Sequence, residues 1–156
     1  MGSLISEGQL KTVSGHVDDA KVKGAKVIAG GNARPDIGPL FYEPTVLTDV
    51  TSDMECANNE TFGPLVSIYP VANVDEAIAK ANDTEYGLAS YIYTQSLDRA
   101  LRVAESIESG MVGVNRGVIS DAAAPFGGIK ESGFGREGGV EGIEEYLDTK
   151  YIALTQ

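Results

Sequence analysis

The chain has 156 residues, 42% of them hydrophobic, which predicts one compact domain or one compact piece of a larger one. Its formal net charge of -11 argues against nucleic acid or an anionic membrane surface as the main partner. One cysteine excludes an intrachain disulfide framework, and no spacing of ligands suggests a metal site. No apolar run reaches the roughly 20 residues of a membrane helix, and the N-terminus has no secretory signal pattern, so the cytoplasm is the expected location.

The N-terminal part predicts a helix followed by a short strand. Ser6 fits a helix N-cap with Gln9 as its capping-box partner, and apolar residues then recur at helical spacing. Gly24 is expected to cap the C-terminal end of this helix. Residues 26–29 predict the strand. A β-rich stretch at 41–47 contains a proline, Pro44, which favours an edge position or a bulge.

The middle of the chain predicts alternating strands and helices. Their order is strand 65–71, a helix capped by Asn73, strand 89–93, a helix starting at Ser96, and strand 111–115. This β-α-β-α-β order predicts parallel strands joined by right-handed crossovers. Gly110 is expected to end the second helix.

The last part of the chain predicts a long glycine-rich loop and two short elements. Residues 116–137 show no periodicity, and a loop of this length inside a compact domain is usually functional or disordered. A short helix at about 140–147 and a β segment at 151–154 follow. No linker, repeat or low-complexity tract is visible, so the sequence suggests no boundary between domains.

Two residues have reactive side chains and are candidates for catalysis. His16 lies on the first helix without an obvious partner, which favours a surface or helix-packing role over catalysis. Cys56 could be a nucleophile, but the acidic neighbours Asp53, Glu55 and Glu60 disfavour the thiolate. The inert interpretation is preferred for both residues.

The segment Glu60-Thr61-Phe62-Gly63-Pro64 precedes a predicted buried strand. A carboxylate at that place could accept hydrogen bonds from ribose hydroxyls, and the aromatic ring could pack on a flat ring such as nicotinamide. The alternative is an ordinary turn with a solvated glutamate and a core phenylalanine. Residue chemistry alone favours the ordinary turn.

A second segment, residues 125–137, reads Pro-Phe-Gly-Gly-Ile-Lys-Glu-Ser-Gly-Phe-Gly-Arg-Glu. Its glycines allow tight turns or close approach to a ligand, and loops on a rigid α/β scaffold often carry binding residues. A mobile surface loop is the alternative, although two phenylalanines argue against simple solvation. The two interpretations are about equally supported.

Taken in order, these segments resemble the aldehyde dehydrogenase superfamily. The stretches 41–47, 86–89 and 110–115 fit the same family, so the resemblance covers nearly the whole chain. Within the family, the strings at 60–65, 110–115, 119–120 and 142–147 look closest to succinate-semialdehyde dehydrogenases.

The resemblance implies NAD(P)-dependent oxidation of an aldehyde through a cysteine thioester. By this resemblance, Glu60 binds the nicotinamide ribose and Phe62 lines the nicotinamide site. Ser120 binds the substrate carboxylate, and Phe126 forms part of the wall of the aldehyde pocket. Glu137 supports the proton relay, and Arg136 has a structural role. A hydroxyl alone binds a buried carboxylate poorly, so cationic help is expected from arginines upstream of this chain.

The family nucleophile, the general base and the dinucleotide-binding domain belong upstream of these motifs. Cys56 stands only four residues before Glu60 and cannot be that nucleophile. The chain is therefore expected to be a piece of an enzyme, inactive alone and binding no cofactor alone. Whether the parent uses NAD or NADP stays open.

The resemblance also implies an architecture and an assembly. The expected fold is α/β, an incomplete three-layer α/β/α arrangement with a mostly parallel sheet, over residues 1–149. Residues 150–156 are expected to form a C-terminal strand that pairs with another subunit, giving a homo-oligomer. An inactive interaction module that oligomerises through this strand is the alternative function. A small aldehyde is the expected substrate, with neither nucleic acid nor membrane as a partner.

Overall fold

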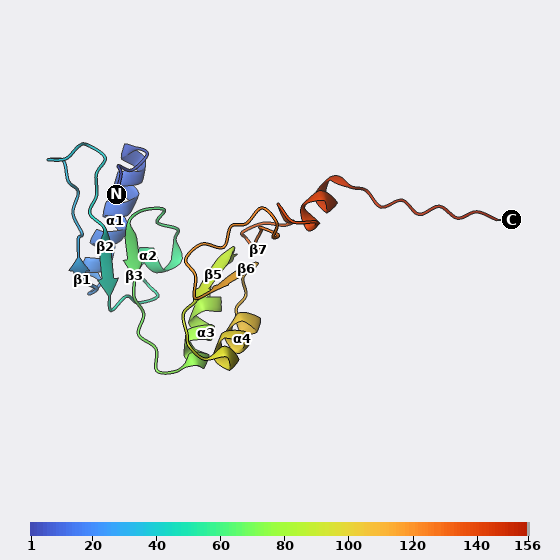
Figure 1. Cartoon of the computed structure of the whole chain (residues 1–156). Helices are drawn as coiled ribbons and strands as arrows, with labels where there is room; N and C mark the ends of the chain where they lie inside the picture. Colours follow the sequence, from blue (N-terminus) through green and yellow to red (C-terminus); the bar gives the residue numbers. More distant parts are fainter. Residues whose placement is uncertain (156) are drawn as a thin grey trace. The chain divides into compact units, whose positions relative to one another are not determined.

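The computed structural model describes residues 1–155, and the chain forms two compact units, Met1–Val71 and Ala72–Gln156. The fold class is α/β, as expected, with helices and strands in both units (Figure 1). The sequence did not mark this division, because no linker composition surrounds residue 71. No helix among residues 1–155 is long and apolar enough to cross a membrane.

The first helix, α1 (Glu7–Val22), begins and ends where the sequence predicts. Ser6 caps it, since its hydroxyl accepts a hydrogen bond from the Gln9 backbone N–H at 3.2 Å. Gly24 follows the C-cap with a φ of 103°, the left-handed conformation that closes many helices. The Gln9 side chain does not complete a capping box, because it bonds to another segment of the chain.

The sheet of the first unit has three strands in the order β1 (Lys26–Ala29), β2 (Thr45–Thr48) and β3 (Leu65–Ser67). β1 and β2 are antiparallel, and β2 and β3 are parallel. The edge position expected from Pro44 is wrong, because β2 is the central strand. Pro44 is tolerated there because it precedes the strand, so its missing N–H costs no ladder bond. An irregularity does occur, but in β1, where the register shifts.

The core of the first unit lies between α1 and the sheet. Ala20, Leu47 and Met54 form one buried cluster, and Val13 and Val17 pack with Tyr42 in another. A short helix that the sequence did not predict, α2 (Glu55–Asn58), packs its partly buried Cys56 against the first cluster. The apolar face predicted for α1 is therefore confirmed.

Burial raises the pKa of Tyr42 to about 12 from 10.0, and the charges of Asp18 and Glu43 act in the same direction. The folded state thus disfavours the phenolate. The contribution of protonated Tyr42 to the free energy of unfolding is complete below pH 10 and is lost between pH 10 and 12. We expect wild type to lose stability relative to Tyr42→Phe over that interval, by at most about 1.4 kcal/mol per pH unit. Urea unfolding of both chains from pH 9 to 11.5 tests this, with Tyr151→Phe as an exposed control; parallel pH profiles would contradict it.

Both helices of the second unit start at predicted caps. Asn73 accepts a hydrogen bond from the Glu76 N–H before α3 (Val74–Asn82), and Ser96 accepts one from the Arg99 N–H before α4 (Leu97–Ser106). The strands β5 (Ala89–Ile92) and β6 (Met111–Val114) on either side of α4 are parallel, which confirms that part of the predicted pattern.

The single sheet implied by the β-α-β-α-β pattern is not formed within this chain. β3 is shorter than the predicted strand 65–71 and belongs to the sheet with β2, so it does not join β5 and β6. A third sheet consists of β4 (Tyr86–Gly87) and β7 (Ile129–Lys130), which are antiparallel. β7 lies inside the stretch expected to be a loop, and its two residues are too few to produce a periodic pattern.

Gly110 does not end α4, which stops at Ser106 with Ile107 as its C-cap. It lies against the backbone of the glycine-rich segment instead. A Cβ atom added at Gly110 would lie 2.1 Å from the carbonyl oxygen of Gly127. The residue is therefore glycine because two stretches of backbone meet there.

The predicted C-terminal helix is present as a 3₁₀ helix, η1 (Glu141–Tyr146). Residues 148–155 belong to no helix or strand, so the expected C-terminal strand is not formed by this chain alone (Figure 1). Tyr151, Ile152 and Leu154 are exposed there. The last residue of the expected strand region, Gln156, lies outside the described residues.

Candidate functional site

The 60–64 segment connects α2 to β3 and presents two of the predicted cofactor-binding residues. Phe62 has a φ of 48° and is 79% exposed, so it is not the core residue of an ordinary turn. Glu60 is exposed, and its carboxylate accepts no hydrogen bond from any of residues 1–155. Both side chains are thus available to a ligand, and a left-handed backbone at a phenylalanine is uncommon enough to suggest function.

Helix α1 holds this segment. The Gln9 side-chain amide donates to the carbonyl oxygens of Thr61 at 2.5 Å and Phe62 at 3.1 Å. His16 is buried, and its Nδ1 makes a hydrogen bond of 2.9 Å with the Thr61 hydroxyl. The helix-packing role predicted for His16 is confirmed, but its partner was missed. The spacing of Gln9 and His16 along one helix face was the available signal.

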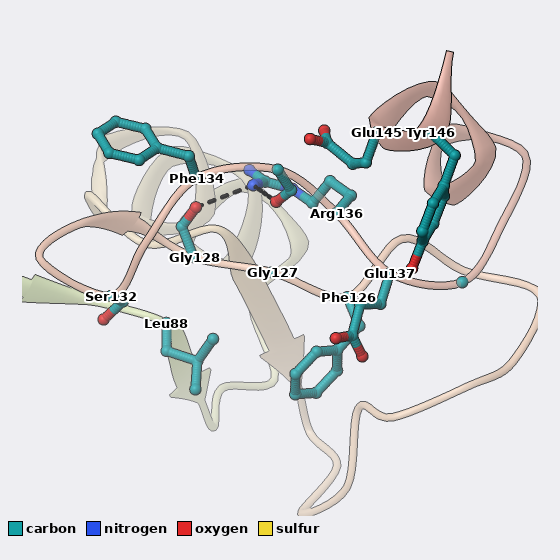
Figure 2. A pocket seen from close by; sticks show the side chains of 13 residues that line it. Leu88, Phe126, Gly127, Gly128, Ser132, Phe134, Arg136, Glu137, Glu145 and Tyr146 are labelled. Atoms are coloured by element: carbon teal, nitrogen blue, oxygen red, sulfur yellow. Dashed lines mark hydrogen bonds between the residues drawn. The ribbon is translucent and has the colours of Figure 1, made fainter.

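The second segment folds back on itself at a backbone bridge. The Phe126 N–H donates to the Glu137 carbonyl at 2.6 Å, and the Glu137 N–H donates to the Phe126 carbonyl at 2.7 Å. Arg136 Nη1 donates to the carbonyls of Gly128 at 2.8 Å and Gly135 at 2.7 Å, which supports its predicted structural role (Figure 2). Phe126 and Glu137, two of the predicted site residues, are therefore brought together.

The same segment is tied to the rest of the second unit. The Lys130 ammonium donates to the carbonyls of Asn82 at 3.0 Å and Thr84 at 3.1 Å, and it forms a 2.6 Å ion pair with Glu108. The Gly87 N–H donates to the Ser132 hydroxyl at 3.0 Å. These bonds hold the segment in place and argue against a mobile surface loop.

A pocket of about 640 Å³ opens between this segment and η1. Figure 2 shows the side chains of Phe126 and Glu137 close together, with Glu145 and Tyr146 coming from η1. Its remaining lining includes Leu88, Ser132, Phe134 and Arg136 with several glycines. Three aromatic rings, two carboxylates and a guanidinium thus surround a space of the size that small-molecule sites usually have.

Ser120 does not line that pocket and is exposed in the segment after β6. The segment is fixed at its start, where the Asn115 side chain accepts from the Thr94 N–H at 2.9 Å and donates to the Thr94 carbonyl at 2.8 Å. Arg116, four residues before Ser120, is a cation that the sequence analysis overlooked. Its Nε donates to the Val118 carbonyl at 2.7 Å, which keeps the guanidinium within this short segment.

A metal site and a nucleophilic cysteine were also sought among residues 1–155. His, Cys, Asp and Glu side chains do not gather there in groups of three that could hold a metal ion. Cys56, on α2, packs against the core cluster of Leu47 and Met54. The exposed functional groups of the two motifs therefore remain the candidates for binding.

Glu60 and Phe62 fit part of a nicotinamide nucleotide. A carboxylate acceptor suits the vicinal hydroxyls of ribose, and an exposed aromatic ring suits the face of a planar heterocycle. The P-loop pattern does not occur in the sequence, and the GxGxxG string at residues 133–138 opens no α-helix, so Glu60 and Phe62 are assigned only to the nicotinamide end.

Comparison with known proteins identifies the family of the chain. A model of the aldehyde dehydrogenase family matches residues 1–152. The chain is 64% identical over its whole length to a Mycobacterium ulcerans protein provisionally named succinate-semialdehyde dehydrogenase (NADP+) 2, and it covers 31% of that protein. It is 51% identical over 98% of its length to 3-sulfolactaldehyde dehydrogenase of Pseudomonas putida, again 31% of the relative.

A solved structure of a family member is also similar to this chain. Succinate-semialdehyde dehydrogenase from Burkholderia pseudomallei superposes with a TM-score of 0.90 and 50% identity, over 94% of this chain and 30% of that one. The chain thus spans about a third of the length of the relatives it matches. Because the family match covers nearly every residue and includes both motifs, the chain belongs to the aldehyde dehydrogenase family.

Proposed function

We propose that this chain supplies the nicotinamide-ribose and aldehyde-binding parts of an NAD(P)-dependent oxidation of succinate semialdehyde to succinate. The observation that carries the proposal is the 60–64 segment, which is fixed by α1 and yet leaves Glu60 and Phe62 exposed. The names of the relatives at 64% and 50% identity support the substrate.

Each residue has a role that follows from its chemistry. Glu60 accepts hydrogen bonds from the ribose hydroxyls, and Phe62 lies against the nicotinamide ring, which accepts hydride when the cofactor is bound. Phe126 forms an apolar wall for the aldehyde, and Glu137 supplies a carboxylate beside it. Ser120 donates to the substrate carboxylate. Arg116 adds positive charge to that segment, which a hydroxyl alone lacks.

We further propose that the chain does not catalyse by itself, because Cys56 is poorly placed to attack an aldehyde. Its side chain is partly buried and packs against the core cluster that contains Leu47 and Met54, so an aldehyde has little access to it. The nucleophile and the phosphate-binding residues then belong to other parts of a longer enzyme of this family.

The proposal predicts that activity requires the remaining parts of the enzyme, and this can be measured. We expect no turnover of succinate semialdehyde by the 156-residue chain with NAD+ or NADP+, and turnover when it replaces the matching third of the M. ulcerans relative. In that joined protein, Glu60→Gln should raise KM for the cofactor about tenfold, a loss of about 1.4 kcal/mol. Glu55→Gln makes the same charge change five residues away on α2 and should leave KM unchanged.

Several outcomes would contradict the proposal. Turnover by the chain alone would refute its dependence on other parts, and equal KM values for Glu60→Gln and Glu55→Gln would refute the role of Glu60. A higher kcat/KM for 3-sulfolactaldehyde than for succinate semialdehyde would refute the substrate. Arg116→Gln tests whether Arg116 recognises the carboxylate of the substrate. It should raise KM for the aldehyde and leave KM for the cofactor unchanged.

We also propose that the elements of this chain complete a three-layer α/β/α domain and assemble through its end. Apolar side chains are exposed on α4, where Leu97 is 71% and Leu101 55% exposed, and on the tail at Tyr151 and Leu154, each 89% exposed. Surfaces of this kind usually meet another part of a protein. Strand pairing by residues 151–154 with a second subunit would cover the tail; an unchanged oligomeric state after their deletion from the joined protein would contradict it.

A further inference from the structure

Three residues on one face of α1 meet the 60–64 segment. Gln9, Val13 and His16 follow one another at intervals of four and three residues, which places them above one another on the helix surface. Gln9 and His16 hydrogen-bond to Thr61, and Gly63 lies so close to Val13 that an added Cβ would be 2.4 Å from its Cγ2. Each of the three thus contacts a different part of the segment.

The hydrogen bonds of Gln9 stabilise an unfavourable backbone conformation at Phe62. Phe62 has a left-handed φ of 48°, a conformation that costs a bulky L-residue roughly 1–3 kcal/mol and persists only when its surroundings impose it. One side-chain amide donates to two successive carbonyls, those of Thr61 and Phe62. Because both bonds are made from the same nitrogen, they fix the two peptide groups on either side of Phe62 relative to each other.

The His16 bond fixes the neighbouring side chain. The ring is 9% exposed, so the partner it finds in the Thr61 hydroxyl satisfies a polar atom that water hardly reaches. The ring tautomer decides which of the two groups donates. In either case the Thr61 side chain points to α1, and the side chain of the next residue, Phe62, points to solvent.

We propose that Gln9 and His16 are positioning residues that hold the 60–64 segment in the conformation presenting Glu60 and Phe62 to the cofactor. The inference rests on the proposed function, in which those two residues contact a nicotinamide nucleotide. Gln9 and His16 act through the Thr61–Phe62 peptide and not by touching the aldehyde or the reacting atoms.

Helix α1 has other anchors besides the bonds made by Gln9 and His16. The helix is anchored by Val13, Val17 and Ala20, all fully buried, and by its own caps. Removal of the Gln9 amide should therefore loosen the segment much more than it lowers the stability of the unit. This difference separates positioning from a general structural role.

The test uses the whole 156-residue chain, labelled with ¹⁵N and with 4-fluorophenylalanine, in the absence of cofactor. In Gln9→Met and His16→Leu we expect the amide signals of residues 60–63 to shift and their order parameters to fall from about 0.85 toward 0.6. The Phe62 fluorine signal, assigned with Phe62→Leu, should move toward its position in urea. The midpoint of urea unfolding should change little for Gln9→Met.

Matched variants identify the bonds that matter. His16→Asn places an amide near the position of Nδ1 and should restore the order lost in His16→Leu. Gln9→Glu replaces a donor by an acceptor facing two carbonyls and should disturb the segment more than Gln9→Met. Thr12→Val is the control on the same helix, since the Thr12 hydroxyl donates only to the Gly8 carbonyl.

Unchanged shifts and order parameters at residues 60–63 in the double variant Q9M/H16L would overturn the proposal. So would equal disturbance by Thr12→Val. Because the measurement is made without cofactor, its result does not depend on the assignment of Glu60. A loosened segment together with an unchanged cofactor KM in the joined protein would instead refute the proposed function.

Discussion

Replacing Gly110 by alanine is expected to destabilise the second unit by about 3 kcal/mol, because the new methyl group cannot be accommodated without moving backbone. Its Cβ would lie 2.1 Å from the Gly127 carbonyl oxygen and 2.8 Å from the Gly128 Cα. Neither contact involves the flexible end of a side chain. The segment that carries Phe126 and Arg136 would have to retreat, so the pocket should change shape as well.

Fluorine NMR of the chain labelled with 4-fluorophenylalanine can follow this loss unit by unit. Phe41 and Phe62 report on the first unit, and Phe126 and Phe134 on the second. In Gly110→Ala, the signals of Phe126 and Phe134 should change to their unfolded positions at a lower urea concentration than in wild type. The signals of Phe41 and Phe62 should keep their wild-type midpoints. Gly117→Ala is the control, because its Cβ meets only the Tyr93 hydroxyl at 3.6 Å. Equal midpoints for the two alanine variants would contradict the expectation.

The second large effect is expected at Gly63, where alanine should cost the first unit about 2 kcal/mol. The added Cβ would lie 2.4 Å from Cγ2 of Val13, a fully buried and β-branched side chain with little rotamer freedom. The clash would push the 60–64 segment off α1 and should also raise the cofactor KM of the joined protein. Gly15→Ala, which meets nothing within 4 Å on α1, is the control and should be neutral or stabilising.

A double-mutant cycle locates the cause of that loss. Val13→Ala alone should cost about 2 kcal/mol, because it removes buried methyl groups and leaves a cavity. The methyl group introduced by Gly63→Ala would fill part of that space, so V13A/G63A should be more stable than the sum of the single losses by at least about 1 kcal/mol. Strict additivity in urea unfolding would show that the two residues do not clash.

The sequence predicted those features that depend on local chemistry. The caps at Ser6, Asn73 and Ser96 are confirmed because a side-chain oxygen three residues from a backbone N–H needs no distant partner. The parallel pair around α4 is confirmed for a similar reason, since a helix between two adjacent strands leaves little choice of pairing.

Features that depend on distant partners were missed. β3 joins β2 and not β5, and β7 pairs with β4 across more than forty residues, choices that periodicity cannot reveal. Gly110 looked like a helix stop but is a point of backbone contact. At the site, the motif resemblance named Glu60 and Phe62. The spacing of Gln9 and His16 placed them on one helix face but could not identify their partners, which lie 45 to 53 residues away.

The division into Met1–Val71 and Ala72–Gln156 also affects how the chain is made. Each unit is one uninterrupted stretch of sequence, and every strand pairing among residues 1–155 lies within its own unit. The first unit can therefore fold while the ribosome is still adding the second, which takes several seconds at roughly 5–20 residues per second. During those seconds α1 already has the 60–64 segment to bind, so the part of the chain assigned to the cofactor can be ordered before the part assigned to the aldehyde has been synthesised.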